Sequence, residues 1–368
     1  MALKDWLNNY LVGCDFLMFD KVNRVHRWSL NNGRLIFSHP KKDIFWEVPP
    51  DFRIPHVAKL GLAEMVLLTP FKENVELEEP IKKPISYSTM NVGVAFSGGV
   101  DSTAVLELLP STIAIYTQVA NVTGLHKIEN ALLSVKEVEG VSVISNYDEL
   151  APVYGKRKGF YGTAGFTVTC ILFSEYYEIH TIADGNVLEM MYLFGSGISG
   201  HGVLYQEINR DEVMSAFRNA GLEYCVPCAG LTEVSTTKIS ANGDYKYSMG
   251  CMRGIKGTPC NNCLKCFRKN GLKGTPIGSN KEVELKLNAR YIPMLPSLIW
   301  AKENKGLNHP VLENVSRDIS WVDKWYAESL QYIPEYLHNY FLEKLEKHGI
   351  EPIDDVCPLI NWTADTEK

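Results

Sequence analysis

The chain has 368 residues, of which 45% are hydrophobic and 22% charged, and its formal net charge is −6. This composition is that of an ordinary globular protein, long enough for two domains or for one large domain with an appendage. The acidic balance argues against nucleic acid as a partner, because phosphate contacts need a basic face. No apolar run approaches the roughly 18 residues of a membrane span, and residues 1–6 do not read as a signal peptide. We therefore expect a cytoplasmic protein with reduced thiols.

The first 90 residues predict a small β-containing N-terminal extension. Apolar-rich segments at 24–30 and 34–37 flank Asn31, Asn32 and Gly33, which is a strong hairpin turn signal. Prolines at 49, 50, 55, 70, 80 and 84 argue against long helices in this part. The charged, proline-marked stretch 76–84 is the predicted linker to the next domain.

From residue 91 onward, short apolar runs alternate with helical patterns. Strands are predicted at 92–96, 112–116, 141–145, 180–183 and 222–226, and helices at 102–109, 125–138, 165–177 and 210–220. Such alternation is typical of an α/β fold, here a parallel five-stranded sheet with helices on both faces. The predicted domains are 1–90, 91–284 and a helical C-terminal segment, 285–368. In that segment we interpret the helical spacing of Tyr336, Tyr340 and Leu345 as a stripe that packs on the main domain, rather than as a base-stacking surface.

A glycine-rich loop follows the first strand of the central domain. It consists of Ser97, Gly98, Gly99, Val100, Asp101 and Ser102. Adjacent glycines let the backbone turn sharply and bring N–H groups to an anion, and the following helix adds its positive end. The loop lacks the lysine of the G-x-x-x-x-G-K-[ST] pattern, so it differs from a kinase-type phosphate loop. It predicts a site for the pyrophosphate end of ATP, with Asp101 either capping the helix or meeting Mg²⁺.

Six of the nine cysteines fall between residues 225 and 266. Cys251, Cys260, Cys263 and Cys266 form C-x8-C-x2-C-x2-C, and four thiolates at this spacing favour structural Zn²⁺ within a loop at 251–266. The pair Cys225 and Cys228 leaves three alternatives open: a redox pair, participation in an iron–sulfur cluster, or simple burial.

The loop resembles the S-G-G-x-D-S loop of the PP-loop ATP pyrophosphatases, whose fold is adenine nucleotide alpha hydrolase-like. Loop and cysteine motif together, over residues 92–271, resemble the 7-cyano-7-deazaguanine synthase (QueC) family. The resemblance implies an ATP-dependent carbon–nitrogen ligase that adenylates 7-carboxy-7-deazaguanine, a step of queuosine biosynthesis. Ammonia then attacks to give an amide, and a second activation gives a nitrile. It further implies that Lys238, in Thr236-Thr237-Lys238-Ile239, contacts the ATP phosphates and that Arg268 steadies the zinc loop.

The sequence departs from the family in its substrate pocket and at its ends. The family's P-G-R-N stretch is not reproduced at residues 161–166, and segments 1–90 and beyond 285 are additional. This suggests a divergent relative whose acyl acceptor is either ammonia or a protein amine docked by the extra segments, the latter in bacterial anti-phage defence. A homodimer is left open.

Two rival functions are kept. One is a PP-loop tRNA thiolase that uses the CxxC cysteines for a cluster or a persulfide. The other is a non-catalytic nucleotide-binding subunit with a decayed pocket.

Overall fold

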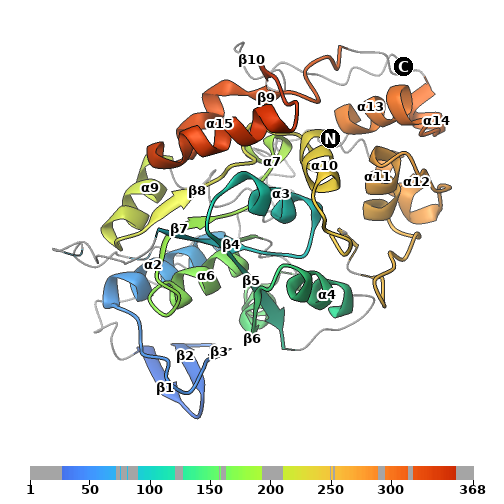
Figure 1. Ribbon diagram of the computed structural model, residues 1–368. Helices are drawn as coiled ribbons and strands as arrows, with labels where there is room; N and C mark the ends of the chain where they lie inside the picture. The colour runs from blue at the N-terminus through green and yellow to red at the C-terminus, as the bar shows by residue number, and fades with distance from the viewer. Residues whose placement is uncertain are drawn as a thin grey trace, which may run out of the picture.

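The computed structural model describes residues 27–71, 75, 81, 90–120, 127–156, 158, 163–192, 210–248, 250–251, 253–288, 295–313 and 318–353 (Figure 1). Its centre is an eight-stranded sheet in the order β1-β2-β3-β6-β5-β4-β7-β8. These strands are β1 (Trp28–Asn31), β2 (Arg34–His39), β3 (Lys42–Glu47), β4 (Asn91–Ala95), β5 (Thr112–Val119), β6 (Val141–Ser145), β7 (Ile179–Ala183) and β8 (Glu223–Cys225). A separate parallel pair joins β9 (Trp325–Tyr326) to β10 (Pro352–Ile353).

The sheet is mixed, and the predicted parallel five-stranded sheet is wrong. Strands β6, β5, β4, β7 and β8 pair in parallel, whereas β1, β2 and β3 pair antiparallel. β3 then joins β6 antiparallel, with Trp46 opposite Ser145. The N-terminal strands therefore extend the same sheet, and they cover the edge that β6 would otherwise expose. The predicted divisions at residues 90 and 284 stay predictions.

The predicted hairpin at Asn31–Gly33 is confirmed. Asn32 and Gly33 both have positive φ, 48° and 71°, as the two central residues of a type I′ turn require. The prediction of no long helix in this region is wrong, because α2 (Val57–Leu68) fits between Pro55 and Pro70. Prolines stop a helix only where they occur, and here they bracket a 12-residue apolar run.

Helices cover both faces of the sheet. The central ones are α3 (Val100–Leu108), α4 (Glu129–Glu137), α5 (Leu150–Val153), α6 (Thr163–Phe173), α7 (Leu188–Tyr192), α9 (Arg210–Asn219) and α10 (Glu233–Asn242). The C-terminal ones are α11 (Leu264–Leu272), α12 (Lys281–Asn288), α13 (Leu295–Lys305), α14 (Pro310–Glu313) and α15 (His338–Lys347). Short 3-10 turns lie at Thr69–Phe71, Tyr147–Glu149, Ala327–Tyr332 and Glu335–Leu337.

Alternate residues of the central strands enter different cores. Ala95 and Ile182 pack with α2 and α6 on one face, whereas Val94 and Ala183 pack with α3 on the other. Because successive strand side chains point to opposite faces, this alternation places α3 and α6 on opposite sides of the sheet.

The C-terminal segment does pack on the central fold, and of the predicted stripe Leu345 is confirmed as a packing residue. Leu337, Phe341 and Leu345 are buried in the core that contains α3, and they follow one another at helical spacing. Tyr336, by contrast, is 44% exposed.

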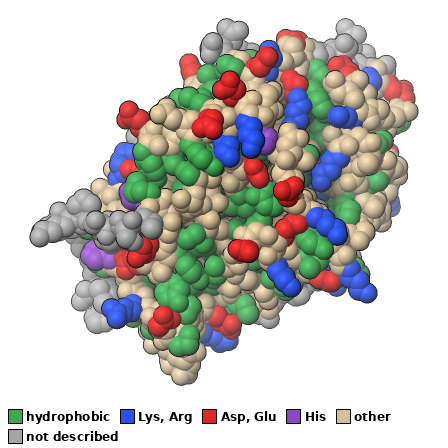
Figure 2. Space-filling view, viewed as in Figure 1, with side chains coloured by type: hydrophobic (Ala, Val, Ile, Leu, Met, Phe, Trp, Pro, Cys, Tyr) green, Lys and Arg blue, Asp and Glu red, His purple; other side chains and the backbone are tan. Residues whose placement is uncertain are grey.

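On the face seen in Figure 2, acidic and basic side chains are interspersed. Of the helices in the described part of the chain, none combines the length and the apolar character needed to cross a membrane. Several predicted features lie outside the described residues: the linker 76–84 except for position 81, the first six residues, and Tyr161 and Gly162 of the altered pocket stretch.

Candidate functional site

The glycine-rich loop lies between β4 and α3, as predicted from the sequence. Ser97 and Ser102 hold the turn closed: the Ser97 N–H donates to Ser102 Oγ, and the two hydroxyl oxygens are also 3.2 Å apart. The Ser102 and Thr103 hydroxyls both donate to the Gly99 carbonyl, at 3.1 and 2.9 Å. Gly98 has a φ of +71°, a conformation that favours glycine. The serines therefore shape the loop from within.

The start of α3 offers a set of backbone donors. Within the described residues, the N–H groups of Gly98, Val100, Asp101 and Ser102 have no hydrogen-bond acceptor, since the first helical bond is donated by Thr103 to Gly99. The first N–H groups of a helix, together with its dipole, attract anions. This geometry can accept a phosphate group.

A second loop, after β7, packs against the same helix start. A Cβ at Gly185 would lie 3.0 Å from the Asp101 carbonyl carbon and from the Ser102 nitrogen, so a larger residue would force this backbone to shift. Beside it, Asp184 accepts hydrogen bonds from the Tyr224 hydroxyl and from the Asn186 N–H. Burial raises the pKa of Asp184 to about 6, although these two hydrogen bonds oppose the rise. The carboxyl ends of β4 and β7 thus meet, as the topology of parallel strands requires.

Asp101, in the first turn of α3, faces α10 and α11. Its Oδ1 accepts from the Thr236 hydroxyl at 2.7 Å and from Lys269 Nζ at 3.1 Å. Burial by itself would raise the pKa of Asp101, but Lys269, the Thr236 hydrogen bond and the charge of Lys265 together lower it. Asp101 is therefore a carboxylate held ionised beside the open backbone donors.

Lys238 lies on another side of α10. Its Nζ forms an ion pair with Asp323 Oδ2 at 2.7 Å and lies 5.5 Å from the centre of the Trp300 ring. Thr236 and Ser240, two residues to either side, contact the loop region through Asp101 and the Val100 carbonyl. Residues two apart in a helix do not share a face. Phosphate contact by Lys238 stays a prediction, and it would require breaking the Asp323 pair.

The four cysteines come together as predicted. The Sγ atoms of Cys251, Cys260, Cys263 and Cys266 all lie within 4.8 Å of one another, and those of Cys260 and Cys266 are 3.7 Å apart. Zn–S bonds of about 2.3 Å would place the sulfurs of a tetrahedral site about 3.8 Å apart. Backbone N–H groups of Cys260, Asn262 and Cys266 donate to the sulfurs of Cys251, Cys260 and Cys263, which stabilises thiolates. This cluster could hold a metal ion such as zinc.

The four-cysteine cluster is connected to the glycine-rich loop through α11. Cys263 caps this helix and Cys266 lies in its first turn. One turn later, Arg268 forms an ion pair with Glu233 at 3.0 Å, and Lys269 forms one with Asp101. Figure 1 shows α10 between α3 and α11, where these contacts are made. Reasoning from the sequence identified Arg268 but missed Lys269 and Glu233. The signal that could have found Lys269 is its position three residues after Cys266, on the same helix face.

Cys225 and Cys228 are separate from the four-cysteine cluster. Both are fully buried, and burial raises the pKa of each thiol well above its ordinary value, with nearby carboxylates adding to the rise. Cys228 Sγ lies 3.8 Å from the Asp101 carbonyl oxygen, as a weak donor would. Of the three alternatives, burial is the one that fits. A thiol kept protonated is a poor nucleophile and a poor metal ligand.

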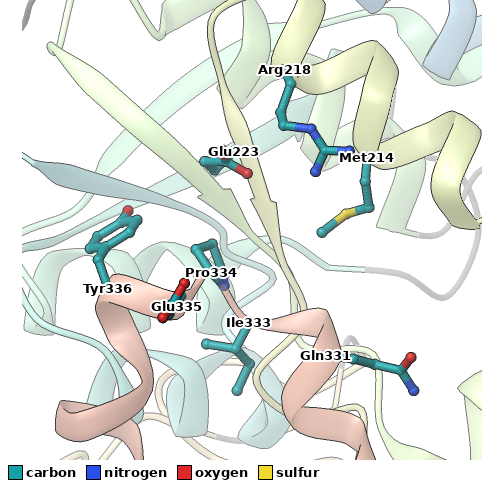
Figure 3. A pocket seen from close by; sticks show the side chains of 8 residues that line it. All are labelled: Met214, Arg218, Glu223, Gln331, Ile333, Pro334, Glu335 and Tyr336. Carbon is teal, nitrogen blue, oxygen red and sulfur yellow. The ribbon is translucent and has the colours of Figure 1, made fainter.

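A cavity of about 720 Å³ opens at the outer edge of the sheet. Figure 3 shows Met214 and Arg218 extending from α9 towards it, Glu223 at the first position of β8, and Tyr336 on the C-terminal segment. Glu223 marks the amino end of β8, whereas the glycine-rich loop follows the carboxyl end of β4. The segment 331–336 that also lines the cavity passes the carboxyl end of β8, where the Val226 N–H donates to the Tyr332 carbonyl. β7 lies between β8 and β4, so the cavity and the glycine-rich loop are on different strands of the sheet.

Comparison with known proteins gives one family match. A family of unknown function, DUF6395, matches residues 212–290. This stretch includes α10, the four cysteines and α11, and it ends before α13. Among curated proteins, none matches the chain. The glycine-rich loop lies outside the family match.

Proposed function

We propose that this protein is an ATP-dependent enzyme that activates a carboxylate by adenylation and passes the acyl group to an amine. The observation that carries the proposal is the loop Ser97–Ser102 at the carboxyl end of β4. There, four backbone N–H groups without acceptors in the described residues adjoin the ionised Asp101. The first turn of α3 would bind the pyrophosphate end of ATP, and Asp101 would hold Mg²⁺ with its second carboxylate oxygen.

The chemistry would need positioning and charge neutralisation rather than a protein nucleophile. The substrate carboxylate attacks the α-phosphate in line, forms the acyl–phosphate bond and expels pyrophosphate. The loop N–H groups would stabilise the charge that builds up on the leaving pyrophosphate, and Mg²⁺ held by Asp101 would supply further charge neutralisation. An amine then attacks the acyl carbon, loses a proton, and AMP leaves with one of the carboxylate oxygens.

The substrate class is proposed from the resemblance to the QueC family. On that basis 7-carboxy-7-deazaguanine is the first carboxylate to test, with ammonia or a protein amine as acceptor. Zn²⁺ at Cys251, Cys260, Cys263 and Cys266 would be structural, because four protein ligands leave no position for a substrate.

The proposal is tested by incubating the protein with ATP, Mg²⁺ and candidate carboxylates while AMP and pyrophosphate are measured. We expect release that depends on the carboxylate and is lost in Asp101→Asn. Binding of ATP without turnover on any carboxylate would instead favour a nucleotide-binding subunit. Intact-mass analysis of the products then distinguishes a small amide or nitrile from a mass gain on a protein.

Metal analysis separates this proposal from the tRNA thiolase. We expect about one zinc per chain, lost in Cys263→Ser and retained in Cys225→Ala and Cys228→Ala. Iron with acid-labile sulfide, or loss of metal in the Cys225 or Cys228 variant, would contradict the zinc assignment and support the thiolase.

A further inference from the structure

Lys269 is a buried lysine between two carboxylates. Its side chain is 6% exposed, and Nζ lies 3.1 Å from Asp101 Oδ1 and 3.9 Å from Glu233 Oε1. A buried ammonium group is retained only where anions compensate for lost solvation. Glu233 forms its closer ion pair with Arg268, so Asp101 is the main ion-pair partner of Lys269.

Asp101 lies where its carboxylate could occupy the N–H donors of α3, and the contact with Lys269 prevents this. An aspartate in the first turn of a helix can turn back and accept hydrogen bonds from the free N–H groups there. If Asp101 did so, it would occupy the donors that a phosphate group needs. Instead its Oδ1 is bound from the other side, by Thr236 of α10 and Lys269 of α11. The pair holds the carboxylate away from the donors of α3 and offsets its charge.

Lys269 is itself placed by the four-cysteine cluster. Cys263 caps α11 with its sulfur and Cys266 follows in the first turn, while Cys251 and Cys260 reach the cluster from the preceding loop. Cys266 and Lys269 are three residues apart in a helix of nine residues, so they share a face of α11. A metal ion that holds Cys266 in place therefore also sets the position of Lys269. Without metal, four neighbouring thiols have little reason to stay together.

We propose that Lys269 is a positioning residue for the glycine-rich loop, and that metal binding at the four cysteines sets its place. This inference rests on the proposed function, since it assumes that the loop binds ATP. Lys269 acts through Asp101: it draws the carboxylate towards α10 and α11 and leaves the donors of α3 to the phosphates. Metal binding at the four cysteines then affects nucleotide binding at the loop, because α11 connects the two sites.

The electrostatic surroundings of Asp101 agree with this role. From α11 it faces Lys269 and Lys265, from α10 it faces Thr236, and from the loop after β8 it faces the Cys228 thiol. Glu233 of α10 lies on the far side of Lys269. Lys269 is the largest of the influences that lower the pKa of Asp101. Removal of Lys269 should therefore leave the Asp101 carboxylate free to turn towards the N–H donors of α3.

The first test measures ATP binding by calorimetry on zinc-loaded protein. We expect Lys269→Met to weaken binding about tenfold, the loss of one charge-assisted hydrogen bond. Lys269→Arg should restore most of the affinity, and Lys281→Met, at an exposed position on α12, should bind like wild type. Thr236→Val, which removes the other donor to Asp101, should weaken binding in the same direction, and zinc content with circular dichroism checks the fold of each variant.

The second test asks whether the metal acts through Lys269. Chelation should weaken ATP binding to wild type, whereas in Lys269→Met, which has already lost the contact, it should add little. The inference would be overturned if a folded Lys269→Met bound ATP as tightly as wild type. It would also be overturned if chelation weakened ATP binding by the same factor in Lys269→Met as in wild type. If wild type does not bind ATP, the proposed function fails, and that failure is seen before any variant is made.

Discussion

Glu189 is a carboxyl group buried in α7 beside the network around Glu233. It is 4% exposed, and its Oε1 accepts from the Glu233 N–H and from the Ser297 hydroxyl, each at 3.1 Å. Within the described residues, Glu189 Oε2 and Glu233 Oε2 have no hydrogen-bond partner. Burial, together with the neighbouring Glu233 carboxylate, raises the pKa of Glu189 to about 8. The group is therefore protonated over most of the physiological range.

This pKa predicts a stability that falls with pH. The unfolded chain releases the Glu189 proton near pH 4.3, whereas the folded chain keeps it to about pH 8. The contribution of Glu189 to the free energy of unfolding is thus full below about pH 4 and is lost as pH rises towards 8. Glu189→Gln, neutral throughout, should be more stable than wild type at pH 8 and show a smaller fall from pH 5 to 8 in urea unfolding. The exposed Glu303→Gln should keep the wild-type fall, and an equal fall in Glu189→Gln would contradict the prediction.

Single residues were predictable where a motif named them. Asp101 and the four cysteines were identified because their spacing carries chemistry. Lys269 was missed because its spacing from Cys266 places it on a helix face without saying what that face contacts. The contact with Asp101 of α3 and the packing of α11 against α10 are seen only in the fold. Lys238 was chosen by resemblance, and its two-residue offset from Thr236 turns it to another face of α10.

At the scale of elements, the contact between the loop after β7 and the start of α3 sets the shape of the site. Gly185→Ala would put a methyl group 3.0 Å from backbone atoms of Asp101 and Ser102, which cannot move aside cheaply. We expect a loss of about 1–3 kcal/mol in the free energy of unfolding and weaker ATP binding. Gly278→Ala, with open space around its Cβ, is the matched control and should change neither. Full ATP affinity in a folded Gly185→Ala would show that this contact does not shape the site.

The predicted elements from β4 to β8 were close to those found, because short apolar runs bounded by turn residues are local signals. β3 was missed although Ile44 and Trp46 alternate with less buried residues, because six residues are too few for the alternation to be a clear strand signal. α2 was missed because it is buried nearly all round and so lacks the polar face that marks a surface helix.

At the scale of the whole molecule, the antiparallel strands share a core with the parallel ones. Trp46 is fully buried, and its Nε1–H donates to Thr169 of α6 at 3.1 Å, while Thr169 is also bound by Thr117 of β5. Trp28 and Phe37 join the same core as α2 and α6. The N-terminal strands are therefore part of the central fold.

This sharing predicts that the N-terminal strands unfold together with the parallel strands. Trp46→Ala should cost about 3–5 kcal/mol in the free energy of unfolding and lower the stability of the whole sheet in one transition. Leu30→Ala, at a position on β1 that is 40% exposed, should stay within about 0.5 kcal/mol of wild type. Hydrogen exchange that shows only β1 to β3 opening early in Trp46→Ala would contradict this.

The order of the whole sheet could not be predicted from the sequence. The join between β3 and β6 has one register pair, Trp46 and Ser145, and hydrogen bonds between Phe45 and Asn146 beside it, all between residues far apart along the chain. Alternation says that a strand is half buried, but it does not say which partner it pairs with. The extension therefore read as a separate unit, and the sheet read as parallel throughout.

Adenylation at the loop Ser97–Ser102 can be followed by the transfer of oxygen from the carboxylate to AMP. The protein is incubated with ATP, Mg²⁺, an amine and a carboxylate substrate labelled with ¹⁸O in both oxygens, and the AMP produced is examined by mass spectrometry. Because the carboxylate oxygen attacks the α-phosphate and leaves with it, the account predicts AMP carrying one ¹⁸O, with none formed by Asp101→Asn. Release of ADP and phosphate, or of AMP without label, would contradict it.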